Sequence, residues 1–146
     1  MILLLLSSFA ISQSHINWSF APKIVICKNE SQTKHEIVNK AKKYWQARGY
    51  SLGDITEKKC DKEIYSYGEI RFAGERSLDT NSYFGLTNRG YANGNVVSGY
   101  IQLANQDANN LELVTHELGH ALGVQHNDIK SDLMYEYHMY ENTDGF

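Results

Sequence analysis

The sequence contains few residues that break or cross-link a chain: one proline, Pro22, and two cysteines, Cys27 and Cys60, among 146 residues. No proline-rich linker, repeat or low-complexity tract divides it, so its length suggests a single domain. The cysteines do not form the closely spaced pair that is typical of cysteine metal sites. In an exported protein an even pair of cysteines favours a disulfide, and we expect a Cys27–Cys60 bridge.

An excess of positive charge is also missing. The 14 Lys and Arg residues and the 17 Asp and Glu residues give a formal net charge of −3. Because binding to nucleic acid needs a basic face, we expect no nucleic-acid partner. The hydrophobic share of 42% is ordinary for a globular protein that buries a core. Nothing in the sequence indicates oligomerisation, so we expect a monomer.

No apolar run is long enough to cross a membrane. The N-terminal stretch from Ile2 to about Ile11 falls short of the roughly 20 residues that a membrane-spanning helix requires. It suits the apolar core of a secretion signal, with Ala10 and Ser12 as the small residues before a cleavage site near Gln13. Because no Lys or Arg follows Met1, in contrast to most such signals, a buried N-terminal strand is the alternative.

On this interpretation residues 1–12 are a signal peptide, and residues 13–146 form one domain that is secreted or extracytoplasmic. No membrane span is expected once the signal is removed. Two Asn-x-Ser sequons, at Asn17 and Asn29, would carry glycans only in a host that glycosylates exported proteins.

The first half of the chain predicts a strand, a helix and a second strand. The run KIVIC at 23–27 is short, apolar and rich in β-branched residues, as strands are. A helix with apolar residues at helical spacing follows; Ser31 is its expected N-cap and Gly49 its expected end. The segment 50–68 is polar and predicts no element. The alternation of charged and apolar residues in EIRFA, 69–73, predicts the next strand.

The second half predicts two strands and a second helix. Residues 81–105 are typical of two strands joined by a loop rich in Gly and Asn at about 89–95. Either Asn109 or Asn110 can cap the helix that follows. Gly123 suits its end, where a left-handed backbone is needed. From there to the C-terminus the pattern is irregular.

Three of the six histidines lie close together near the end of this second helix. His116 and His120 are four residues apart, so on a helix their imidazoles project from one face, one turn apart. Two nitrogens so placed can hold one cation, and a catalytic zinc usually has three protein ligands. His126 is the candidate third ligand, because Gly123 lets the chain leave the helix and turn back.

Glu117 is offset by about 100° from His116 on the helix, which places it beside a metal rather than among its ligands. There it can act as a general base toward water that the metal activates, and then pass the proton to a leaving amine. Zinc is the expected ion, although copper or nickel would also bind three imidazoles. The simpler alternative is an amphipathic helix that carries histidines on its surface.

The motif HELGHALGVQH resembles the His-Glu-x-x-His-x-x-Gly-x-x-His pattern of the metzincin zinc proteases. The later SDLMYEY resembles their methionine turn, and its LMY is most similar to the matrixin branch. The resemblance implies that His116, His120 and His126 bind zinc, that Glu117 is the general base, and that Met134 forms a hydrophobic floor. It also implies an α+β fold, in which a twisted mixed sheet packs with two main helices and a short C-terminal subdomain.

The resemblance further implies a groove for peptide. Residues 82–88 match the position of the edge strand that pairs with substrate in matrixins, although the same residues could form an ordinary sheet strand. A specificity pocket beside the metal would be walled by the segment from Met134 to Tyr137. One departure is Glu136, where matrixins have proline after Met-Tyr. The expected substrate-binding residues are Phe84, Gly85, Leu86, Tyr135 and Tyr137.

Together these features predict a secreted zinc metalloendopeptidase that acts on peptides or proteins. Two alternatives come from other functional classes. One is a zinc-containing module that binds peptide but cleaves it weakly or not at all; the intact Glu117 argues against this module. The other is a protein whose histidines bind metal only for stability, but such sites usually have four ligands. The sequence does not indicate whether calcium binds.

Overall fold

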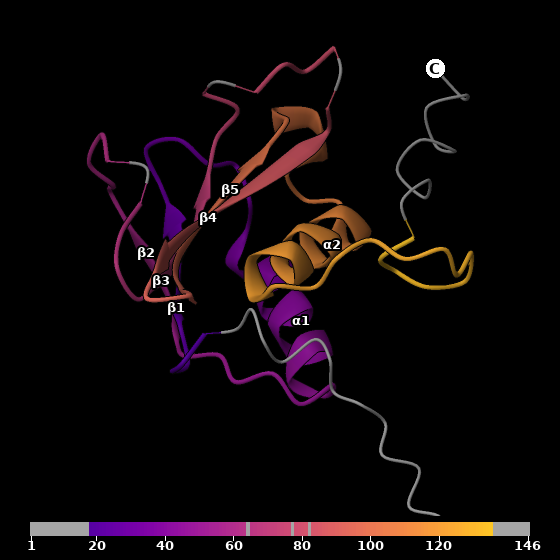
Figure 1. Ribbon diagram of the computed structural model, residues 1–146. Coiled ribbons are helices and arrows are strands. Elements are labelled where there is room, and N and C mark those ends of the chain that lie inside the picture. The colour runs from indigo at the N-terminus through magenta and orange to yellow at the C-terminus, as the bar shows by residue number, and fades with distance from the viewer. Residues whose placement is uncertain (1–17, 64, 77, 82, 136–146) are drawn as a thin grey trace, which may run out of the picture.

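One mixed sheet of five strands organises the computed structural model, which describes residues 18–63, 65–76, 78–81 and 83–135 (Figure 1). Across the sheet the strand order is β2-β1-β3-β5-β4. Adjacent strands are parallel except for β4 and β5, which are antiparallel. The strands are β1 (Lys23–Cys27), β2 (Ile55–Lys58), β3 (Glu69–Ala73), β4 (Gly85–Ala92) and β5 (Asn95–Leu103).

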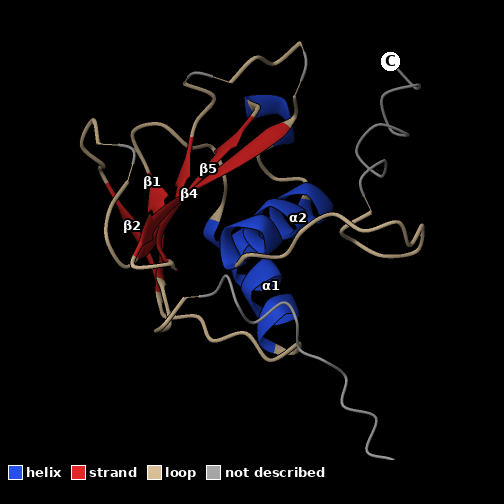
Figure 2. Cartoon of the chain, in the orientation of Figure 1, coloured by secondary structure: helices blue, strands red, loops and turns tan. Residues whose placement is uncertain are grey.

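Both main helices, α1 (His35–Gln46) and α2 (Leu111–Leu122), lie on the same side of this sheet (Figure 2). A short 3₁₀ helix, η2 (Asn105–Asp107), precedes α2. The expected α+β class, mixed sheet and two helices are therefore confirmed. The expected signal peptide and Tyr137 lie outside the described residues. Among those described, no helix combines the length and apolar character needed to span a bilayer.

The core fills the space between the helices and the sheet. Apolar residues at alternate positions of the strands face the helices, as the period of two in a strand requires. The buried residues of this core include Ile24, Ile26, Ile70, Phe72, Ile101 and Leu103 from the sheet, and Val38, Ala41, Trp45, Leu113, Val114 and Leu118 from the helices. Because α2 packs on β4 and β5, its sequence motif is held at the β4 edge of the sheet.

The opposite face of the sheet is covered by the segment that follows β2. The predicted disulfide joins Cys27 at the end of β1 to Cys60, and both side chains pack with Val25. The prediction of this bridge is confirmed. The charged residues of β3 also lie on this face, but they are buried: Glu69 is 8% exposed and Arg71 is 6% exposed. The charged positions of the alternating EIRFA pattern therefore face a covered layer of charged residues and not solvent.

The start of α1 differs from the prediction. Ser31 does not cap the helix; its hydroxyl accepts a hydrogen bond from the Thr33 N–H at 3.1 Å. The helix begins at His35, and no side chain caps it. Instead the N–H of Lys34 donates to the side-chain oxygen of Asn109 at 2.7 Å. The segment before α2 thus fixes the residue that precedes α1 without capping the helix, a contact that the order of residues near 31 does not reveal.

The connection between β4 and β5 is tighter than the predicted loop at 89–95. β4 continues to Ala92 and β5 begins at Asn95, so the turn consists of Asn93 and Gly94. Both have positive φ, at 52° and 80°, which is the backbone of a two-residue hairpin turn favoured by Asn-Gly. The other glycine and asparagine residues of this segment pair in the strands. The polar segment 50–68 also contains one short strand, β2, which its sequence did not indicate.

Candidate metal centre and active site

Helix α2 presents the histidine motif because its two ends are well defined. Of the two candidate caps, Asn110 is the one used: its side-chain oxygen accepts the Leu113 N–H at 3.2 Å. At the other end Gly123 has a left-handed backbone with φ of 103°. The N–H of Val124 then donates to the Gly119 carbonyl oxygen at 2.9 Å, which closes the helix. The chain can therefore turn back after Gly123.

The three imidazoles meet at one point. Each pair among the Nε2 atoms of His116, His120 and His126 is separated by 3.0 Å. Three nitrogens at this spacing fit around a single ion whose bonds to nitrogen are about 2.0–2.1 Å long, as for zinc. His116 is buried, His120 is half-buried and His126 is exposed. The group is therefore closed on the protein side and open to solvent on the other, as a three-ligand site with a free position requires.

Backbone carbonyl groups orient two of the rings. Nδ1 of His116 lies 2.9 Å from the Leu133 oxygen, and Nδ1 of His120 lies 2.8 Å from the Val124 oxygen. Since a carbonyl oxygen only accepts, each Nδ1 must carry the proton, which leaves the Nε2 lone pair facing the cluster. Burial, followed by the charge of His116, lowers the pKa of His120 to about 4. His120 is therefore neutral near pH 7, the form that binds a metal.

The segment of the methionine turn packs directly against this helix. Met134 is 2% exposed. A Cβ atom added to Gly119 would lie 3.0 Å from the Met134 sulfur and would overlap the ring of Trp45. The N–H of Asn127 donates to the Met134 oxygen at 3.0 Å, which ties the residues after the third histidine to the turn. Gly119 therefore allows Met134 and Trp45 to approach the helix closely.

Glu117 is a buried carboxyl group beside the histidines. The residue is 6% exposed, and burial raises its pKa to about 7, although a hydrogen bond from Thr87 acts in the opposite direction. Oγ1 of Thr87 lies 2.5 Å from Oε2 of Glu117 and 3.1 Å from the Glu117 backbone oxygen. The group can therefore be ionised or protonated near neutral pH, as proton transfer at a catalytic site requires.

The residues expected to bind substrate fall in different environments. Phe84 is partly buried against the core, Leu86 is 37% exposed and Tyr135 is half-buried. Gly85 lies against Glu117: a Cβ atom at Gly85 would come within 3.0 Å of its Cγ. β4 is the last strand of the sheet, so one of its edges does not pair with another described strand.

Thr87 is the residue of this site that the sequence analysis missed. β4 pairs Thr87 with Ile101 and Gly85 with Leu103, and both partners on β5 belong to the core that faces the helices. Residues directly opposite in a sheet share a face, so Thr87 and Gly85 face α2. Because side chains alternate between the two faces of a strand, the position of Gly85 alone would have placed Thr87 on that face. Its contact with Glu117 depends on how α2 packs on β4.

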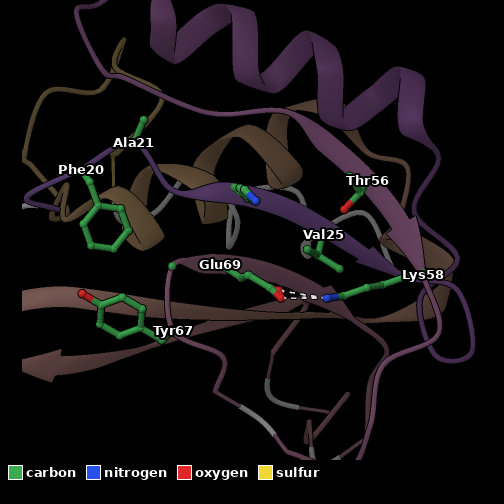
Figure 3. A pocket seen from close by; sticks show the side chains of 9 residues that line it. Phe20, Ala21, Val25, Thr56, Lys58, Tyr67 and Glu69 are labelled. Carbon is green, nitrogen blue, oxygen red and sulfur yellow. Dashed lines mark hydrogen bonds and ion pairs between the residues drawn. The ribbon is translucent and has the colours of Figure 1, made fainter.

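A hollow of about 390 Å³ lies on the face of the sheet that points away from the helices, over β1, β2 and β3 (Figure 3). Phe20 and Tyr67 stand at one end of it. Glu69 and Lys58 are paired inside it, with Nζ of Lys58 3.0 Å from one carboxylate oxygen. Within the described residues, the histidine triad is the cluster of side chains able to hold a metal ion. The hollow is therefore not the candidate for metal-dependent chemistry.

Comparison with known families agrees with this geometry. The sequence matches the matrixin family model over residues 10–146, which is most of the chain. A comparison with curated proteins finds no match. Members of the matrixin family bind zinc, and the three histidines form a group that could hold such an ion. The extent of the family match, together with the sheet and helices that carry the motif, shows that this chain belongs to the matrixin family of metzincin metalloproteases.

Proposed function

We propose that this protein is a zinc-dependent endopeptidase with one catalytic ion. His116, His120 and His126 would hold the ion, since their Nε2 atoms are mutually 3.0 Å apart around one point. This triangle of imidazoles, with a buried carboxyl group beside it, is the observation that carries the proposal. A zinc ion held there supplies a Lewis acid that polarises a carbonyl group and acidifies water.

Glu117 is the proposed general base. It lies next to His116 on α2, and its pKa is raised to about 7 by burial, so it can both accept and release a proton near neutral pH. In the reaction it would take a proton from the attacking water and return it to the nitrogen that leaves. Met134, buried against Gly119, would support the triad from the protein side.

Substrate would bind as an extended peptide along the free edge of β4. Unpaired N–H and C=O groups of an edge strand can add a further strand, which holds the backbone of many sequences. Under this proposal Phe84, Gly85 and Leu86 belong to the rim of the groove, and Tyr135 and Tyr137 to the pocket wall. Binding through the main chain is consistent with an enzyme that cuts within polypeptides.

We further propose that the protein acts outside the cytoplasm as one catalytic domain, residues 13–146, after removal of residues 1–12. The Cys27–Cys60 disulfide supports this, because such bonds persist in oxidising compartments.

The test is cleavage of a mixed library of quenched fluorescent peptides by the purified protein. It is measured with zinc, with a chelator, and in the Glu117→Ala variant, with zinc content determined in parallel. We expect turnover that the chelator abolishes and that Glu117→Ala reduces by at least about 1,000-fold while zinc is retained. Turnover that survives both treatments would overturn the proposal. One zinc bound per chain without any turnover would instead support the peptide-binding module.

A further inference from the structure

We propose that Thr87, on the edge strand β4, is a positioning residue for Glu117 and fixes where its carboxyl group lies. This inference rests on the proposed function, in which Glu117 accepts a proton and later releases it. The observation behind it is the position of Oγ1 of Thr87, which lies within hydrogen-bond distance of two oxygens of the same residue: Oε2 at 2.5 Å and the backbone oxygen at 3.1 Å.

A hydroxyl group has one proton to donate. Both oxygens within reach of the Thr87 hydroxyl belong to Glu117, one on its side chain and one on its backbone. The hydroxyl therefore ties β4 to the residue that carries the carboxyl group. Its contact with Oε2 restricts where that group can lie.

The surroundings of Glu117 make this contact important. Glu117 is 6% exposed, so few water molecules can replace a lost partner. Gly85, two residues earlier on the same face of β4, leaves room for the carboxyl group: an added Cβ atom would lie 3.1 Å from Oε1. On this face of β4, Gly85 thus leaves space for the carboxyl group and Thr87 forms a hydrogen bond with it. A base held in this way needs little reorganisation during proton transfer.

Thr87→Val tests the proposal, because valine keeps the shape and the β-branch but has no hydroxyl group. We expect kcat to fall about 10–100-fold, KM to change less than about two-fold, and zinc content to stay the same. Thr87→Ser, which restores the hydroxyl, should recover kcat to within about three-fold of the wild type. The matched control is Thr56→Val, the same change on the exposed face of β2, with wild-type kinetics expected.

Two further results separate this inference from the proposed function. In the Glu117→Gln background, Thr87→Val should cause no additional loss, since Thr87 acts through the carboxyl group. A crystal structure of Thr87→Val should show Glu117 in a new or divided rotamer, and this readout does not need turnover. Unchanged kcat in Thr87→Val, or Thr87→Ser as impaired as Thr87→Val, would overturn the inference. If no variant cleaves peptide, the proposed function fails, and an unmoved Glu117 in the crystal would then overturn the inference as well.

Discussion

At the scale of single residues, His126 differs from the other two histidines of the triad. It is exposed and lies beyond the end of α2, whereas His116 and His120 belong to the helix and are oriented by carbonyl groups. Under the proposed function, His126 on this irregular segment would still contribute one third of the protein's bonds to the ion. Removing the His126 side chain therefore tests whether the site has three histidine ligands or two.

We predict that His126→Ala weakens zinc binding by more than the roughly 10–100-fold that is lost when a residue that only orients a ligand is removed. The measurement is a competition titration against a chromophoric chelator. His35→Ala is the matched control, because His35 is an exposed histidine on α1, outside the triad. Equal zinc affinity in the wild type and His126→Ala would exclude His126 from the ligand set.

At the scale of elements, α1 and α2 approach each other closely at Gly119. Trp45 of α1 is 4% exposed and its ring N–H donates to the Thr115 oxygen of α2 at 2.8 Å, so the ring is fixed where a Cβ atom at Gly119 would stand. In an isolated helix alanine is favoured over glycine by about 1 kcal/mol. Here the steric overlap outweighs that preference.

We predict that Gly119→Ala lowers the free energy of unfolding by about 1–3 kcal/mol, the usual cost of overpacking a core. Urea denaturation followed by circular dichroism measures it. Trp45→Phe has a smaller ring, so in a double-mutant cycle Gly119→Ala should cost less in the Trp45→Phe background. A stabilised Gly119→Ala variant would show that the ring can move aside.

A second set of contacts joins strands on the outer face of the sheet. Lys58 of β2 reaches across β1 to Glu69 of β3, with Nζ 3.0 Å from Oε1, and Arg71 lies 3.5 Å from the same oxygen. Burial alone would raise the pKa of Glu69. The hydrogen bond from Lys58 and the charges of Arg71 and Lys58 outweigh it, so the pKa of Glu69 lies below the ordinary value of a glutamate carboxyl group.

A carboxyl group whose pKa is lower in the folded chain stabilises the fold above its unfolded pKa, and this contribution is lost as pH falls through the folded pKa. We predict that Glu69→Gln costs about 1–3 kcal/mol at pH 7 and that its difference from the wild type shrinks below pH 4.5. Urea denaturation across pH measures both effects. Glu57→Gln, which removes a solvent-exposed pair with Lys28, should change stability by less than about 0.5 kcal/mol. A constant difference between Glu69→Gln and the wild type at every pH would contradict the assignment.

At the scale of the whole molecule, the disulfide closes the loop that contains α1 and β2. It joins Cys27 and Cys60 across 33 positions, with their Cα atoms 5.2 Å apart. The bond removes unfolded conformations in which β1 lies far from the segment that covers it, and it thereby lowers the entropy of the unfolded chain. That segment supplies Asp61, which binds Arg71 at 3.1 Å on the outer face.

We predict that removal of the bridge in a Cys27→Ala, Cys60→Ala variant costs about 3–4 kcal/mol of stability, from the loop-closure entropy of a loop this long. The measurement is guanidinium denaturation with and without reductant. Reductant should destabilise the wild type by a similar amount and leave the double variant unchanged. A loss below about 1 kcal/mol, with full oxidation shown by intact mass, would mean that the unfolded chain is already compact.

The sequence alone determined the parts of this protein that depend on local spacing. The four-residue spacing of His116 and His120 puts both on one helix face, and Gly123 marked the end of that helix because only glycine readily adopts a left-handed backbone. The apolar run at β1 and the matrixin-like motif indicated the α+β fold in the same way. These features depend on neighbours within one or two turns, so no knowledge of the tertiary structure was needed.

Only the tertiary structure decided the contacts between residues that are distant in the chain. Thr87 meets Glu117 because β4 and α2 pack together, 30 positions apart in sequence. Asn109 holds the residue that precedes α1, whereas the predicted cap Ser31 does not cap the helix. The short strand β2 exists because β1 offers it a partner. Such contacts depend on which surfaces pack together once the core has formed, and a local pattern of residues carries no information about that choice.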